Sequence, residues 1–78
     1  MLFIDFKNGG LIMTIYTARE YNNVYDGGQQ AVDRGDYRSA YDHFMACLKY
    51  KKRYESWNET EISHLEYLVK QCNAMFNK

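Results

Sequence analysis

The sequence predicts an all-α protein: a three-helix domain, made of a helical hairpin plus a C-terminal packing helix, behind a flexible N-terminal tail. Three stretches repeat apolar or small residues in steps of three and four, the period of one helix face. A capping residue precedes each stretch, and no run alternates like a strand except a few residues within 11–16. We expect the tail to cover residues 1–16 and the domain residues 17–78.

The tail differs from the rest of the chain because Gly9 and Gly10 interrupt any regular element, and no helical or strand period continues from the tail into the domain. The same glycine pair back-translates into a ribosome-binding sequence at a suitable distance before the codon of Met13. Met13 is therefore a candidate for the native start, with Met1 as the alternative.

The first helix is predicted to begin after Thr17, which forms a capping box with Glu20, and to end at Gly35 as a left-handed cap residue. Gly27 and Gly28 lie inside it, where each costs about 1 kcal/mol relative to alanine. A close contact with another helix is the expected compensation. The predicted core stripe is Ala18, Tyr21, Val24, Tyr25, Gly28, Ala31 and Val32.

The second helix is capped by Asp36 and extends to about Tyr54, with a strongly amphipathic pattern. Its predicted stripe is Tyr37, Ala40, Tyr41, Phe44, Cys47, Leu48 and the stem of Lys51. After a short connection, Asn58 and Glu61 open the third helix. Its predicted stripe is Ile62, Leu65, Leu68, Val69, Cys72, Met75 and Phe76.

Residues 21–54 resemble one tetratricopeptide repeat, a helical hairpin of 34 residues. The matching positions are Gly28, the turn Gly35-Asp36-Tyr37, Ala40, Phe44 and Cys47. Val24 and Gly27 depart from the pattern, since they stand where the repeat prefers Trp and Leu, and the closing proline is missing. One repeat cannot bury its own apolar face. The resemblance implies that the third helix, or a second copy of the chain, covers the hairpin.

Composition favours a protein that binds other proteins. Ten basic and ten acidic residues cancel, which argues against a dedicated duplex-binding protein. Eight tyrosines and one tryptophan are the residue types enriched where protein surfaces meet. We predict a non-catalytic binding module that forms a homodimer. The candidate partner-binding residues are Tyr21, Tyr25, Tyr37, Tyr41, Tyr50, Arg53, Tyr54 and Trp57.

The chain carries no signal-peptide pattern and no apolar run near the roughly 20 residues of a membrane helix, so a cytoplasmic protein with free thiols is expected. No cofactor is predicted. A zinc site built from His43, Cys47, His64 and Cys72 is an alternative, but the cysteines lie on core stripes. No catalytic constellation is recognisable, so we predict no enzyme.

Two further functions stay open. The run from Lys49 to Trp57 interleaves cations with aromatic residues, as surfaces that bind single-stranded nucleic acid do. A structural or assembly protein is the other alternative.

The short length and the richness in Tyr, Asn and Lys resemble the small early proteins of large phages that infect Gram-positive bacteria. Such proteins commonly shut down host machinery by covering a binding surface. Among them, phage inhibitors of the DNA sliding clamp, the β subunit of DNA polymerase III, are the most similar in kind. The resemblance implies a steric mechanism in the host cytoplasm, in which a compact helical dimer blocks clamp loading or DNA passage.

Overall fold

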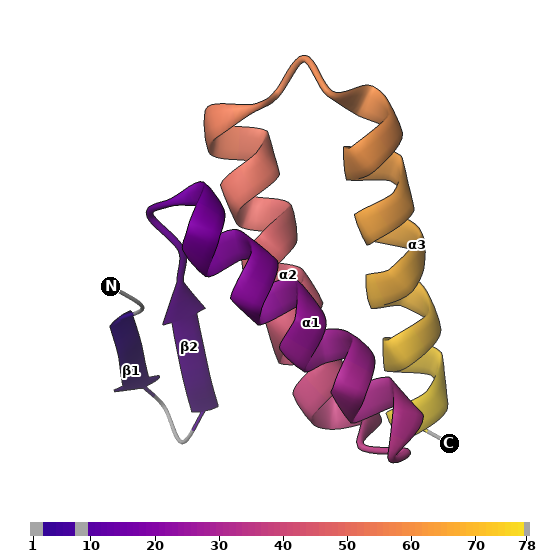
Figure 1. Ribbon diagram of the computed structural model, residues 1–78. Helices are drawn as coiled ribbons and strands as arrows, with labels where there is room; N and C mark the ends of the chain where they lie inside the picture. The colour runs from indigo at the N-terminus through magenta and orange to yellow at the C-terminus, as the bar shows by residue number, and fades with distance from the viewer. Residues whose placement is uncertain (1–2, 8–9, 78) are drawn as a thin grey trace.

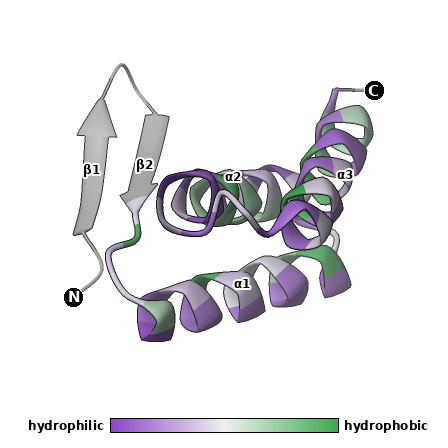
Figure 2. Ribbon diagram, turned by 90° about the horizontal axis from the view of Figure 1, so that it is seen from above, coloured by the Kyte–Doolittle hydropathy of each residue, from purple (hydrophilic) through white to green (hydrophobic). Residues whose placement is uncertain are grey.

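The computed structural model describes residues 3–7 and 10–77, and it confirms the three-helix domain. The helices are α1 (Ala18–Asp33), α2 (Tyr37–Tyr54) and α3 (Glu59–Phe76). Helix α2 lies at the centre and packs against both α1 and α3 (Figure 1). Two strands, β1 (Phe3–Lys7) and β2 (Gly10–Thr14), precede the helices. In Figure 1 they lie beside α2, on the side away from α3. Seen from above, α1 and α3 lie on different sides of α2 (Figure 2).

The two strands were not predicted. They pair antiparallel, with Phe3 opposite Thr14 and Lys7 opposite Gly10. The sequence Asn8-Gly9 stands between the paired residues Lys7 and Gly10, and Asn-Gly is strongly favoured in two-residue hairpin connections. Glycine is also typical of breaks between elements, and the tail was predicted from that property and from the lack of a period that continues into the domain, so the hairpin signal was missed.

The helical core also begins earlier than residue 17. Ile15, which directly follows β2, is buried with an exposed fraction of 5%. Strand β2 packs against α2, which places Ile15 against that helix. The predicted boundary at residue 17 therefore leaves Ile15, a buried core residue, outside the domain whose core it joins.

The predicted helix caps are confirmed at all three N-termini. Side chains of Thr17, Asp36 and Asn58 accept hydrogen bonds from backbone N–H groups three residues later, at 3.1, 3.2 and 3.3 Å. At the end of α1, Gly35 has a φ of 81°, and the N–H groups of Gly35 and Asp36 donate to the carbonyls of Val32 and Ala31. This pairing is the Schellman arrangement, in agreement with the left-handed cap predicted at Gly35.

The capping box at Thr17 differs from the expected form in one contact. The Glu20 carboxylate accepts from the Tyr16 N–H at 3.3 Å and from the Thr17 hydroxyl at 3.1 Å. In the expected form it would accept from the Thr17 N–H. Glu20 therefore links the segment between β2 and α1 to the first turn of α1.

The glycines inside α1 mark the predicted close contact with α2. A Cβ atom on Gly28 would lie 2.8 Å from Cε1 of Phe44, and one on Gly27 would lie 2.9 Å from the ring of His43. Real Cβ atoms do not approach other atoms so closely, so α1 needs glycine here to pack this tightly against α2. Phe44 is fully buried, whereas the His43 ring is only half-buried.

These two glycines make a matched pair of test positions. We expect Gly28→Ala to destabilise the fold, because the Phe44 ring that the new Cβ would meet is fully buried and overpacking costs about 1–3 kcal/mol. The gain of about 1 kcal/mol in helix propensity offsets part of this loss. Gly27→Ala is expected to cost less, since the His43 ring can turn outward. Urea unfolding followed by circular dichroism measures both, and equal losses would contradict the assignment.

Most predicted core positions are buried, and α2 contributes the largest share. Phe44, Cys47 and Leu65 are the largest fully buried side chains, and Lys51 is buried as predicted, with 8% exposed. Three positions differ. Ala18 and Met75 are exposed. Tyr50, which was predicted to contact a partner, is buried, with only 9% of its surface exposed. The buried residues outside the predicted stripes are Ile15, Glu20, Ala46 and Tyr50.

Candidate functional site

Aromatic rings form a continuous chain from the C-terminal end of α2 into the core. Tyr54 and Tyr50 have ring centroids 5.1 Å apart, and Tyr50 and Tyr21 are 5.3 Å apart. The chain continues from Tyr21 to Tyr25 at 6.2 Å and from Tyr25 to Phe44 at 5.6 Å. Stacked, tilted and edge-to-face pairs at these distances stabilise a core beyond the area that they bury. Most of these tyrosines therefore hold α1 to α2.

The structure divides the eight predicted partner-binding residues into two groups. Tyr21 and Tyr50 are buried, and Tyr25, Tyr37 and Tyr41 are half-buried. Tyr41 packs edge-on against Phe76 at 5.3 Å, which joins α2 to the end of α3. The exposed members gather where α2 ends and the connection to α3 begins, and they are Arg53, Tyr54 and Trp57. We call these three residues the exposed cluster.

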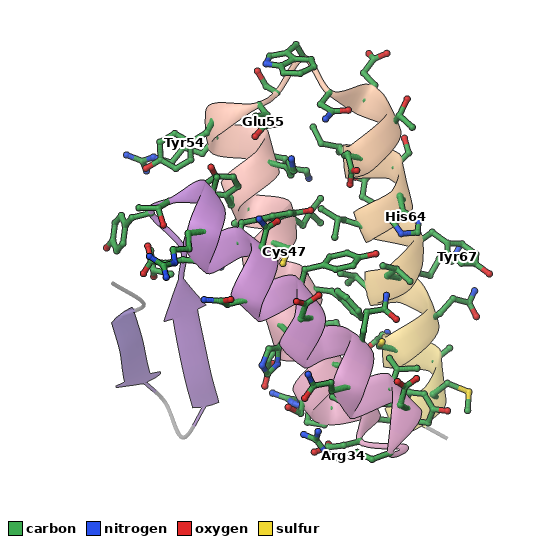
Figure 3. All side chains as sticks on the ribbon, viewed as in Figure 1. Arg34, Cys47, Tyr54, Glu55, His64 and Tyr67 are labelled. Atoms are coloured by element: carbon green, nitrogen blue, oxygen red, sulfur yellow. The ribbon has the colours of Figure 1, made fainter. Side chains whose placement is uncertain are left out.

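Trp57 has 75% of its surface exposed, and Tyr54 has 47%. The guanidinium carbon of Arg53 lies 5.5 Å from the centre of the Tyr54 ring, a cation–π contact. Figure 3 shows Tyr54 at the side of the molecule away from His64 and Tyr67. Tyr67 on α3 is exposed as well, at 60%, and it was not among the predicted partner-binding residues.

The cations of α2 do not share one surface. Lys51 turns toward α1, where its Nζ lies 4.6 Å from the centre of the Tyr21 ring and donates to Glu55 at 2.9 Å. Lys52 turns toward α3 and lies 3.7 Å from the carboxylate of Glu66. Successive residues of a helix point in directions about 100° apart, so neighbouring lysines separate in this way. The cations between Lys49 and Trp57, which were predicted to bind nucleic acid, therefore do not point to one side of α2.

The contact between Lys51 and Glu55 changes the acidity of the carboxyl group. The hydrogen bond from Lys51 favours the ionised carboxylate and so lowers the pKa of Glu55 below its usual range. A group whose folded-state pKa is lowered stabilises the fold above its unfolded pKa, which is about 4.3 for glutamate. This stabilisation is lost as the pH falls below that value and through the folded-state pKa.

We therefore expect Glu55→Gln to be less stable than the parent chain at pH 7, with a difference that shrinks below about pH 4. Urea unfolding at several pH values measures the difference. Asp26→Asn is the matched control, because Asp26 is exposed and has no ion-pair partner within the described part of the chain. A Glu55→Gln difference that stayed constant with pH would contradict the role of this ion pair.

A pocket of about 170 Å³ lies between the end of β2 and the last turns of α2. Its floor is apolar, formed by Ile15 and Ala46, and the rings of Tyr50 and Tyr54 line a wall. Thr14, Lys49 and Arg53 complete the lining, and neither cation has an acidic partner among residues 14–77, whose side chains the structure describes. We call it the basic-aromatic pocket. In the sequence, only the four-residue spacing of Lys49 and Arg53, and of Tyr50 and Tyr54, hints at it.

The histidines and cysteines of the alternative zinc site make other contacts. The Nδ1 of His43 lies 2.7 Å from the carbonyl oxygen of Ser39, and the Nε2 of His64 lies 3.1 Å from the hydroxyl of Tyr25. Cys47 and Cys72 are free and buried. Burial raises the pKa of the Cys47 thiol to about 12, so it stays protonated at neutral pH. No group of three metal-binding side chains occurs in the described residues.

Within residues 3–7 and 10–77, none of the helices combines the length and the apolar character needed to cross a bilayer. Comparisons of the chain with family models, with curated proteins and with solved structures gave no match. The fold and the site define a small three-helix protein with an exposed cluster and a basic-aromatic pocket at one end.

Proposed function

We propose that this chain is a non-catalytic protein-binding module that uses the exposed cluster as its main contact. The observation that supports it is the exposure of Tyr54 and Trp57 beside Arg53, at the end of a well-packed helix. Tyr, Trp and Arg are the residue types that carry most binding energy in protein interfaces. A solvent-exposed tryptophan has much apolar surface to bury against a partner.

The particular function that we propose is inhibition of the host DNA sliding clamp by a phage-encoded protein. This proposal rests on the resemblance in length and composition to small phage proteins that take over the host. The inhibitor would act sterically, by covering a surface that the clamp needs for loading or for DNA passage.

We also propose that the active form is a homodimer. The exposed aromatic and apolar side chains outside the cluster support it, since Tyr16, Tyr67 and Met75 are 56%, 60% and 38% exposed. A second copy that covered part of this surface would add stability to a chain with a small core. Analytical ultracentrifugation over a range of concentrations tests the dimer, and a single monomer mass throughout would refute it.

Binding to the purified clamp, measured by calorimetry, tests the proposed function. Truncation of a hot-spot residue costs about 2 kcal/mol or more, so Trp57→Ala should weaken binding about 30-fold. Gln71→Ala is the control, because Gln71 is an exposed residue of α3 outside both the exposed cluster and the side chains offered for the dimer. No binding of the parent chain to the clamp would refute the clamp as partner. Equal losses in both variants would refute the exposed cluster as the contact.

A further inference from the structure

The basic-aromatic pocket shares Arg53 and Tyr54 with the exposed cluster, and it adds Lys49 and an apolar floor. It combines an apolar floor, Ile15 and Ala46, with two cations at its rim. A cavity of roughly 150 Å³ is enough to hold one benzene ring, so this pocket of about 170 Å³ has room for one aromatic or aliphatic side chain. The pocket and its rim thus match a ligand that joins an apolar group to a negative charge.

The charges around the pocket favour an acidic ligand. Lys49 and Arg53 lie four residues apart on α2 and therefore project from the same face of that helix. The other nearby cations, Lys51 and Lys52, are paired with Glu55 and Glu66 and face away from the pocket. No carboxylate occurs among the described residues that line it. The positive charge at the rim is left for a ligand to neutralise.

We propose that the basic-aromatic pocket binds a short acidic peptide segment of the partner protein. In this arrangement an Asp or Glu carboxylate pairs with Arg53 and Lys49, and a neighbouring apolar side chain enters the pocket against Ile15 and Ala46. The planar guanidinium of Arg53 suits a carboxylate, because it offers two parallel N–H donors. This inference rests on the proposed protein-binding function and names the chemistry of its partner.

A peptide segment explains the site better than a nucleic acid strand does. A strand needs cations that follow its backbone over several nucleotides. Here two cations flank one pocket, and the two lysines between them on α2 are turned to α1 and α3. The geometry provides for one charged group and one apolar group, which adjacent side chains of a peptide supply.

Nuclear magnetic resonance titration tests the proposal on the full chain. The probe is the blocked peptide acetyl-EFED-amide, and its uncharged counterpart acetyl-QFQN-amide serves as the control ligand. We expect the acidic peptide to shift the signals of Ala46, Tyr54 and the Arg53 side chain, and to bind at least tenfold more tightly than the uncharged one. Equal binding of the two peptides, or shifts mapped to another surface, would overturn the proposal.

Matched charge variants separate the pocket from a general effect of net charge. Lys49→Gln combined with Arg53→Gln should weaken binding of the acidic peptide at least tenfold. Arg34→Gln combined with Lys70→Gln removes the same charge elsewhere and should leave it unchanged. Figure 3 shows Arg34 at the end of the molecule far from Tyr54. Equal loss in both double variants would overturn the proposal.

Two further results decide between occupants. Tighter binding of a ten-nucleotide thymidine strand than of the acidic peptide, through the same two cations, would replace the peptide by nucleic acid. Loss of self-association in the Lys49→Gln, Arg53→Gln variant would instead identify the occupant as a second copy of this chain. If the chain binds its protein partner through Trp57 and the pocket variant binds equally well, the pocket proposal fails while the binding function stands.

Discussion

Phe44→Ala is expected to leave most of the protein unfolded at 25 °C. The Phe44 ring is fully buried, packs against Tyr25 at 5.6 Å and fills the space that Gly28 leaves open on α1. Truncation of a buried phenylalanine to alanine costs about 3–5 kcal/mol. A single core in a chain of this size rarely supplies more than about 3–5 kcal/mol. The loss is therefore comparable to the whole stability of the fold.

Circular dichroism with urea unfolding measures the effect of Phe44→Ala. Gln71→Ala is the control, since Gln71 is exposed and surface substitutions usually stay within about 0.5 kcal/mol. A Phe44→Ala variant with nearly the stability of the parent chain would show that α1 and α2 are held together by other contacts than the one through Gly28 and Phe44.

Leu65→Ala is expected to release α3 from the helical hairpin. The buried residues of α3 are Leu65 and Cys72, and Leu65 has no exposed surface. Its truncation costs about 2–5 kcal/mol, which removes most of what holds α3 against α2. Without α3, the face of α2 that carries Tyr41 and Lys52 is uncovered. Because a lone hairpin cannot bury its apolar face, we expect α1 and α2 to unfold together with α3.

Hydrogen exchange of backbone amides distinguishes two outcomes for Leu65→Ala. Loss of protection in all three helices at once is the expected result. Selective loss in α3, with α1 and α2 still protected, would show that the hairpin is stable without a covering helix. Thr60→Ala, at an exposed position of the same helix, is the control, because it leaves the buried face of α3 intact.

The helices and their ends could be predicted in detail from the sequence because their signals are local. A cap residue and the residue three positions later, such as Asp36 and Ser39, lie close together whatever the rest of the chain does. The prediction of a tight contact at Gly27 and Gly28 is confirmed as well. The β1–β2 pair was missed because a glycine indicates a break between elements and a hairpin connection alike, and only the pairing of the strands distinguishes the two.

The candidate site was predicted only in part. Arg53, Tyr54 and Trp57 are exposed at the end of α2 and in the connection to α3, whereas Tyr21 and Tyr50 belong to the core. Composition shows that tyrosine is abundant, but a tyrosine serves equally well inside a core and on a surface, since its ring is apolar and its hydroxyl is polar. The pocket could not be predicted because its floor joins Ile15, before α1, to Ala46 on α2.

The sequence by itself determined where the helices begin and end and which face of each is apolar, since backbone capping and helical period depend on neighbours within four residues. Only the tertiary structure decided what covers each face. Packing of β2 beside α2 forms the pocket and places Lys49 and Arg53 at its rim. Lys51 instead contacts Tyr21 of α1, and Lys52 pairs with Glu66 of α3. The physical reason is that a helix period fixes the direction of a side chain, and the neighbouring element decides whether that direction leads to core, ion pair or solvent.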